Sequence, residues 1–191
     1  MKKMLLVILL TGISFATLAQ KNQKKTAVKK EVIVPQQKYS CDSIVVDFEN
    51  GLLNGKIGPG SPADSIKKYL PCVATEIPFE NDDRVCGGGM LFEKQGIYFN
   101  LEHGFIEFNP STTAYLPLPV FGVHEDDLEA LTGEPVEVKD LQPYTDRAVQ
   151  SVYLFPKKYG CLAIWVDQKD KITFKVQLHS QSTAKAYLCI E

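Results

Sequence analysis

Long hydrophobic runs are scarce in this sequence. The longest, Leu5 to Ala16, falls well short of the roughly 20 apolar residues that a membrane-spanning helix needs. We therefore expect no transmembrane segment. No cysteine stands directly at the end of this run, and Cys41 lies too far downstream to be an acylation site, which argues against a lipoprotein.

Closely spaced cysteine and histidine ligands are also missing. The chain has five cysteines and three histidines, but no pair of them has the short spacing of a zinc site. Asn81-Asp82-Asp83 and Glu125-Asp126-Asp127 offer oxygen ligands for calcium. The second cluster stands at an expected helix start, where acidic side chains stabilise the helix dipole anyway. We expect no metal ion and no cofactor.

The amino terminus has the pattern of an export signal. Lys2 and Lys3 precede the apolar run, and Thr17-Leu18-Ala19 supplies small residues at a cleavage site. This arrangement predicts a signal peptide over residues 1–19 that is removed on secretion. We expect the mature chain in the periplasm, outside the cell or on the surface of a bacterium.

Residues 20–40 differ in composition from the rest of the chain. They contain six lysines and one glutamate and predict a basic, flexible tether. The tether is either a plain spacer or an arm that weakly contacts anionic envelope surfaces. From Cys41 onward, 13 Lys and Arg stand against 22 Asp and Glu, a net charge of −9. This balance argues against nucleic acid and favours a basic protein partner.

Two stretches of the chain resemble each other at a distance of 63 positions. Asp83-Arg84-Val85 and Leu91-Phe92-Glu93-Lys94 match Asp146-Arg147-Ala148 and Leu154-Phe155-Pro156-Lys157. A repeat of this kind indicates architecture before any single motif does. We expect a first repeat over residues 41–117 and a second over residues 118–191. The repeated Asp-Arg pairs are interpreted as ion pairs that stabilise turns.

Hydrophobic patterning predicts the elements within each repeat. A short helix ending in proline is expected within 60–71 and again within 122–135. Apolar residues alternate with polar ones in three segments, as in strands with one covered face: 97–102, 162–167 and 172–178, the last with Ile172, Phe174, Val176 and Leu178 on one side. A further strand is expected at 105–108, which the repeat aligns with 172–176. Residues 109–120, which contain Pro110, Pro117 and Pro119, are expected to connect the repeats outside any central strand.

The fold class expected from these patterns is α+β. Two tandem repeats would each pack a short helix on an antiparallel sheet of about four strands, with the other sheet face left to water or a partner.

The helix ends resemble a known family. Leu131-Thr132-Gly133-Glu134-Pro135 follows the second expected helix, and the corresponding Leu70-Pro71 lacks the glycine. A short helix with this ending, followed by antiparallel strands and occurring twice, resembles the tandem-repeat fold of secreted β-lactamase inhibitor proteins. It is also similar to small outer-membrane assembly lipoproteins. The resemblance spans roughly residues 52 to 180 and implies a binding or inhibitory module that uses its outer sheet face and loops. It does not imply that β-lactamase is the target.

Disulfide bonds can form in an exported chain, and because five cysteines are an odd number, one remains outside any set of internal pairs. We predict bonds between Cys72 and Cys86 and between Cys161 and Cys189, with Cys41 as the odd thiol. A Cys41 bond that anchors the first strand is the alternative.

A catalytic cysteine is a further possibility that the sequence raises. Cys86 precedes Gly87-Gly88-Gly89, and His103, His124 and His179 are potential bases for a nucleophilic thiol. Glycines within a strand more often mark a bulge or a close backbone approach. We expect no enzymatic activity.

The residues expected to bind a partner lie on the outer sheet face. Tyr98, Tyr153 and Trp165 would form an aromatic patch, flanked by Glu102 and Lys175, since Trp and Tyr dominate interface hot spots. The alternative is that this face is covered and the aromatic residues are core.

Three functions fit these features. The leading hypothesis is a protein-binding module, such as an inhibitor or immunity protein against a secreted or cell-wall-acting enzyme. The second is a structural envelope component that assembles with outer-membrane proteins. The third, a Cys86-dependent enzyme, is the least supported.

Overall fold

The computed structural model describes residues 40–78, 88–133, 135, 137–141 and 149–181. All of them belong to one compact unit, Gln37–Glu191. In this part of the chain, no helix combines the length and apolar character needed to cross a membrane.

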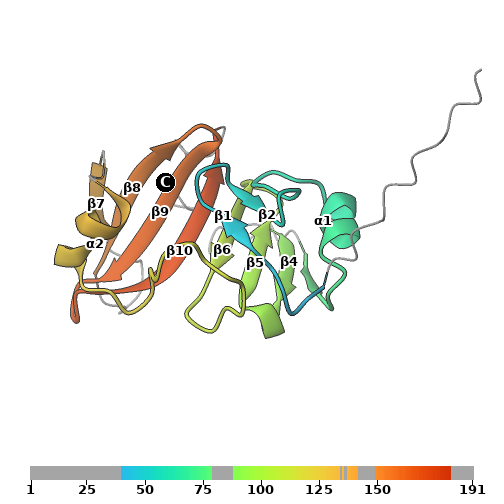
Figure 1. Ribbon diagram of the computed structural model, residues 1–191, viewed down its shortest axis with the longest axis horizontal. Coiled ribbons are helices and arrows are strands. Elements are labelled where there is room, and N and C mark those ends of the chain that lie inside the picture. The colour runs from blue at the N-terminus through green and yellow to red at the C-terminus, as the bar shows by residue number, and fades with distance from the viewer. Residues whose placement is uncertain (1–39, 79–87, 134, 136, 142–148, 182–191) are drawn as a thin grey trace, which may run out of the picture. The chain divides into compact units, whose positions relative to one another are not determined.

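The described residues form an α+β structure, as expected (Figure 1). The helices are α1 (Ala63–Tyr69), the 3₁₀ helix η1 (Glu93–Gln95) and α2 (Glu125–Thr132). The strands are β1 (Val46–Asp47), β2 (Leu52–Leu53), β3 (Thr75–Ile77), β4 (Gly89–Phe92), β5 (Ile97–Asn100), β6 (Phe105–Phe108), β7 (Glu137–Leu141), β8 (Gln150–Lys157), β9 (Gly160–Asp167) and β10 (Ile172–Ser180).

Eight strands form one antiparallel sheet in the order β3-β4-β5-β6-β10-β9-β8-β7. α1 precedes the four-strand set β3 to β6, and α2 precedes the four-strand set β7 to β10. The last strands of the two sets pair in the middle of the sheet, from Phe105 opposite His179 to Phe108 opposite Val176. We call this pairing the seam.

One face of the sheet carries the main hydrophobic core. Inward residues of β5 and β6, such as Phe99 and Ile106, cluster there with Ile66 of α1 and Leu128 of α2. α1, α2 and the small β1-β2 sheet lie on this side, which we call the inner face (Figure 1). The opposite side is the outer face.

Both helices begin with acidic residues, which suits the helix dipole. α1 follows Pro62 and carries Asp64 in its first turn. α2 has three acidic residues in its first turn, and the His124 side chain at its start accepts a hydrogen bond from the Asp126 backbone. Gly133, at φ 83°, ends α2 in a conformation that side-chain-bearing residues rarely adopt.

The proline-containing connection lies outside the large sheet, as expected. Tyr115 and Val45 form an isolated parallel bridge beside β1. Further along, the Gly122 backbone N–H donates to the Thr173 carbonyl at 3.0 Å, which joins the connection to β10.

The disulfide between Cys41 and Cys72 corrects one predicted pairing. Their Cα atoms lie 5.6 Å apart, so Cys72 is bonded to Cys41 and not to Cys86. The alternative, a Cys41 bond near the first strand, is the one observed. Sequence spacing does not reveal that the start of the folded region lies beside the end of α1. Cys86 and Cys189 lie outside the described residues, and with them the second predicted pair.

Candidate functional site

The outer face holds most of the residues that the sequence assigned to binding. Tyr98 on β5 stands opposite Glu107 on β6, and Glu107 stands opposite Gln177 on β10. Trp165 on β9 stands opposite Lys175 on β10. Because side chains alternate along each strand, these five residues share the face opposite the helices.

A set of direct contacts links four of these side chains across the seam. The Trp165 indole N–H donates to Gln177 Oε1 at 3.0 Å, and Gln177 Nε2 donates to Glu107 Oε2 at 2.6 Å. The Lys175 ammonium lies 3.8 Å from the centre of the Trp165 ring and 4.0 Å from Glu107 Oε2. A cation over an indole face is attracted by the ring quadrupole. We call Glu107, Trp165, Lys175 and Gln177 the seam cluster.

A β-bulge places Lys175 in this position. Thr173 is opposite Val166 and Lys175 is opposite Trp165, so β10 has one more residue here than β9. The extra residue breaks the predicted alternation: Phe174 packs with the apolar outer-face residues of β8 and β9 and not with the main core. Bulges commonly redirect side chains in this way.

The aromatic patch expected from the sequence does not form. Trp165 is only 4% exposed and packs with Val152 and Ala163, which agrees with the alternative that it is core. Tyr153 stands opposite Ile164, on the inner face. A strand's alternation reveals two faces but not which of them is covered, so sequence alone misassigned both residues.

The accessible part of the outer face is smaller than expected. Glu102 is exposed, while Tyr98, Glu107 and Lys175 are partly exposed. The Tyr98 ring meets Phe105 edge-on at 6.0 Å between centroids, and burial raises the pKa of its phenol. Sequence analysis missed Glu107 and Gln177, although both occupy outward positions in the predicted strands.

His179 extends the seam cluster into the buried part of the outer face. Its Nε2 lies 3.1 Å from Gln177 Oε1, and its ring lies 5.2 Å from that of Phe105. An amide oxygen only accepts hydrogen bonds, so Nε2 carries the proton and Nδ1 is an acceptor. Among the described residues, Nδ1 has no hydrogen-bond partner. Burial, helped by the nearby Lys175 charge, lowers the pKa of His179 to about 3, so the ring is neutral.

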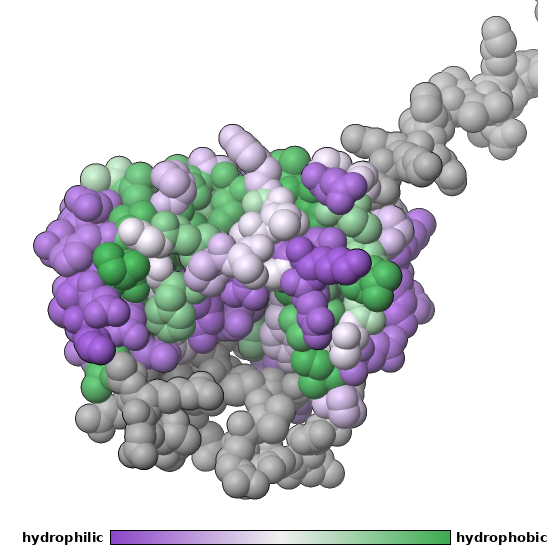
Figure 2. Space-filling view, turned by 90° about the horizontal axis from the view of Figure 1, so that it is seen from below, coloured by the Kyte–Doolittle hydropathy of each residue, from purple (hydrophilic) through white to green (hydrophobic). Residues whose placement is uncertain are grey.

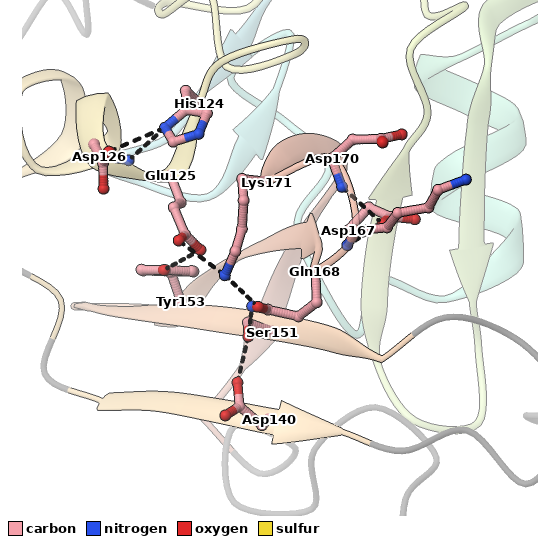
Figure 3. A network of polar contacts seen from close by, with 11 residues as sticks. His124, Glu125, Asp126, Asp140, Ser151, Tyr153, Asp167, Gln168, Asp170 and Lys171 are labelled. Atoms are coloured by element: carbon pink, nitrogen blue, oxygen red, sulfur yellow. Dashed lines mark hydrogen bonds and ion pairs between the residues drawn. The ribbon is translucent and has the colours of Figure 1, made fainter.

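A second polar cluster joins α2 to the far end of the sheet (Figure 3). The Tyr153 hydroxyl donates to Glu125 at 3.1 Å, and the Lys171 ammonium lies 3.0 Å from the same carboxylate. Lys171 also donates to Gln168 at 2.5 Å. The hydrogen bonds continue from Gln168 to Ser151 on β8, and from Ser151 to Asp140 on β7. We call these residues the α2 network.

The contacts in the α2 network indicate that its residues hold α2 against the sheet. Burial, followed by the Glu125 carboxylate, raises the pKa of Tyr153 to about 12. Glu125, one of the candidate calcium ligands, is engaged by Tyr153 and Lys171, and Asp126 lies 3.3 Å from His124 Nδ1. Within the described part of the chain, no three His, Cys, Asp or Glu side chains are grouped to hold a metal ion.

Several sequence predictions concern residues beyond the described part. They are the catalytic role of Cys86 beside Gly87, the predicted bond between Cys161 and Cys189, the acidic cluster 81–83 and both Asp-Arg pairs. Gly89, which is described, leaves no room for a side chain: an added Cβ would lie 2.0 Å from the Phe99 carbonyl oxygen. A close backbone approach was one of the two explanations expected for these glycines.

No protein-family model matches this chain, and no curated protein or solved structure is significantly similar to it.

Proposed function

We propose that this chain is an exported, non-catalytic binding module whose outer sheet face contacts a protein partner. The observation that supports this best is the seam cluster. Glu107 and Lys175 reach the surface, yet both are held by the buried Trp165 and Gln177. Side chains fixed before binding lose little conformational entropy when a partner arrives.

The proposed architecture is a tandem duplication. The sequence alignment pairs Phe92 with Phe155 and Ile97 with Leu162, and the strands agree with it: Phe92 stands opposite Ile97 on β4 and β5, and Phe155 stands opposite Leu162 on β8 and β9. Agreement between sequence matches and strand register supports a repeat with the boundaries 41–117 and 118–191.

The proposed location is the envelope or exterior of a bacterium, after removal of residues 1–19. The Cys41–Cys72 bond supports this location, because disulfides persist mainly in oxidising compartments. The excess of acidic residues after Cys41 favours a basic partner through electrostatic steering. An inhibitor or immunity protein for a secreted or cell-wall-acting enzyme combines these properties.

The test begins with cross-linking and co-purification of the mature chain from its native envelope, followed by titration of the identified partner. A Tyr98→Ala/Glu102→Ala variant changes the partly exposed Tyr98 on the outer face and the exposed Glu102 in the turn after β5, without touching Trp165. We expect its Kd to rise at least tenfold, since central aromatic contacts typically contribute 2 kcal/mol or more, about a thirtyfold change. Glu93→Ala, at an exposed position of η1, is the matched control and should keep the parent Kd.

Two results would contradict the proposal. If the double variant binds as tightly as the parent chain, the outer face is not the binding surface. If a folded sample captures no protein partner at all, the chain is not a protein-binding module.

A further inference from the structure

Two Asn-Gly pairs stand in the turns on either side of β2. Asn50-Gly51 precedes the strand and Asn54-Gly55 follows it. Hydrophilic residues lie among hydrophobic ones over the side of the molecule seen in Figure 2, so water reaches much of the described surface. Because the two pairs are identical in sequence, a difference in their reactivity must come from the structure around them.

An asparagine followed by glycine can lose its side-chain amide without an enzyme. The backbone nitrogen of the glycine attacks Cγ of the asparagine, so that an N–Cγ bond forms and the Cγ–Nδ2 bond breaks. Ammonia leaves and carries away the proton of the backbone amide. Water then opens the cyclic imide at either of its carbonyl groups and gives aspartate or isoaspartate. Glycine favours the first step because it has no Cβ to hinder a close approach.

The two glycines differ in the space around them. Gly51 is buried, and a Cβ added to it would lie 2.5 Å from Cγ of Tyr159. Gly55 is exposed, and an added Cβ would meet no atom of the described residues within 4 Å. The cyclic imide needs room beside the glycine, which the Asn54-Gly55 turn offers and the Asn50-Gly51 turn does not.

The hydrogen bonds of the two asparagine side chains differ as well. The Val45 N–H donates to Asn54 Oδ1 at 2.9 Å. This oxygen gains negative charge as the glycine nitrogen attacks, and a donor held beside it stabilises that charge.

The Asn50 side chain has a carboxylate as its neighbour instead. Its Nδ2 donates to Asp47 Oδ2 at 2.7 Å. This hydrogen bond, together with those from the backbone of Asn50 and Glu49, lowers the pKa of Asp47. The charge of Asp47 therefore opposes the second negative charge that an attack on Asn50 would create.

We propose that Asn54 is a site of spontaneous deamidation in the folded chain, and that the fold protects Asn50. The inference concerns a chemical modification and does not rest on the function proposed above. Its consequence falls on β1, because the Asn54 backbone N–H also donates to the Val45 carbonyl at 2.8 Å. Aspartate keeps the backbone and an acceptor oxygen for Val45. Isoaspartate adds an atom to the main chain, which moves residue 54 away from Val45.

The test follows both asparagines during incubation of the full mature chain at mildly alkaline pH, where the glycine amide loses its proton more readily. Peptide mapping by mass spectrometry measures the conversion at each site. We expect Asn54 to convert at least about tenfold faster than Asn50, a smaller factor than the loss of one oxyanion donor causes in an enzyme. The matched control is the same chain unfolded in guanidinium chloride with its disulfide reduced, in which both pairs should convert at similar rates.

A comparison of the products tests the effect on β1. Asn54→Asp supplies the aspartate product directly and should unfold at the same urea concentration as the parent chain. The isoaspartate form, separated by chromatography, should unfold at a lower concentration. Equal conversion of both asparagines in the folded chain, or conversion of Asn54 only after unfolding, would overturn the proposal. An isoaspartate form as stable as the parent would show that residue 54 does not hold β1.

Discussion

The two halves of the eight-stranded sheet present the same order of elements but are stabilised differently. The strands of the first half, β3 to β6, are three or four residues long, whereas those of the second half, β7 to β10, are five to nine residues long. The second half also has an apolar cluster on its outer face, formed by Val152, Leu154, Cys161, Ala163 and Trp165.

The two helices are attached to the sheet by different contacts. α1 contributes Ile66 to the main core and is followed by the buried Leu70, whereas α2 contributes Leu128 and is joined to the sheet by the α2 network. On the outer face, Tyr98 and Glu107 of the first half and Lys175 of the second half are partly exposed, while Trp165 of the second half is buried. The comparison indicates that apolar packing stabilises the second half on both faces of the sheet.

The largest expected effect on stability comes from truncating an aromatic residue on the outer face, and it should differ between the two halves. Trp165→Ala should lower the free energy of unfolding by about 3–5 kcal/mol, the usual cost of truncating a buried tryptophan. Tyr98→Ala, on the same face in the first half, should cost about 1 kcal/mol, the typical effect of a point mutation. Urea denaturation of both variants measures the difference. Equal losses would show that the two halves are buried alike.

The disulfide provides the next test, this time in the first half. A Cys41→Ser/Cys72→Ser variant should lose about 3–4 kcal/mol, because the bond closes a loop across a sequence separation of 31 and restricts the unfolded chain. Thermal and urea unfolding measure the loss. If stability is unchanged, the first half does not depend on this covalent bond.

Acidification should weaken the seam between the halves. The folded pKa of His179 is about 3, below its ordinary value of 6.5, so the unfolded chain takes up a proton that the folded chain excludes. The stabilising contribution is complete above about pH 6.5 and is lost as the pH falls toward 3, by up to about 1.4 kcal/mol per pH unit. Urea denaturation between pH 7 and pH 5 should show this slope, and His179→Gln should flatten it. An unchanged slope in the variant would assign the pH dependence to other groups.

The smallest effect concerns the α2 network. Tyr153→Phe removes the hydroxyl that donates to Glu125 and should cost about 1 kcal/mol, the net value of a typical hydrogen bond. Tyr115→Phe, which alters an exposed phenol in the connection, is the matched control and should have no measurable effect. A loss of the same size in both variants would mean that the contact with Glu125 contributes nothing specific.

Local patterns in the sequence predicted part of the secondary structure. Alternation identified β5, β9 and β10, the repeat match placed β6, and the helical segments contain α1 and α2. The short strands β1, β2 and β3 were not predicted. The alternation of polar and apolar residues in a strand is visible in the sequence. Which face of the sheet is buried depends on the segments that pack against it. The position of Tyr153 on the inner face and the burial of Trp165 could therefore not be predicted.

Two further features depend on spatial proximity. The Cys41–Cys72 bond joins the start of the folded region to the end of α1, and the seam cluster combines side chains from β6, β9 and β10. The bulge at Phe174 left no clear signal either, because the alternation on both sides of it looks continuous in sequence.

The Cys41–Cys72 bond also determines how the folded region would respond to mechanical force. A pull on the chain that precedes Cys41 would pass through the covalent bond to the residue just beyond α1. Without the bond, the same force would act first on the Val45–Tyr115 bridge and the two-residue strand β1, which would peel away one hydrogen bond at a time. The disulfide would thus divert traction on the residues before Cys41 away from β1 and its bridge to Tyr115.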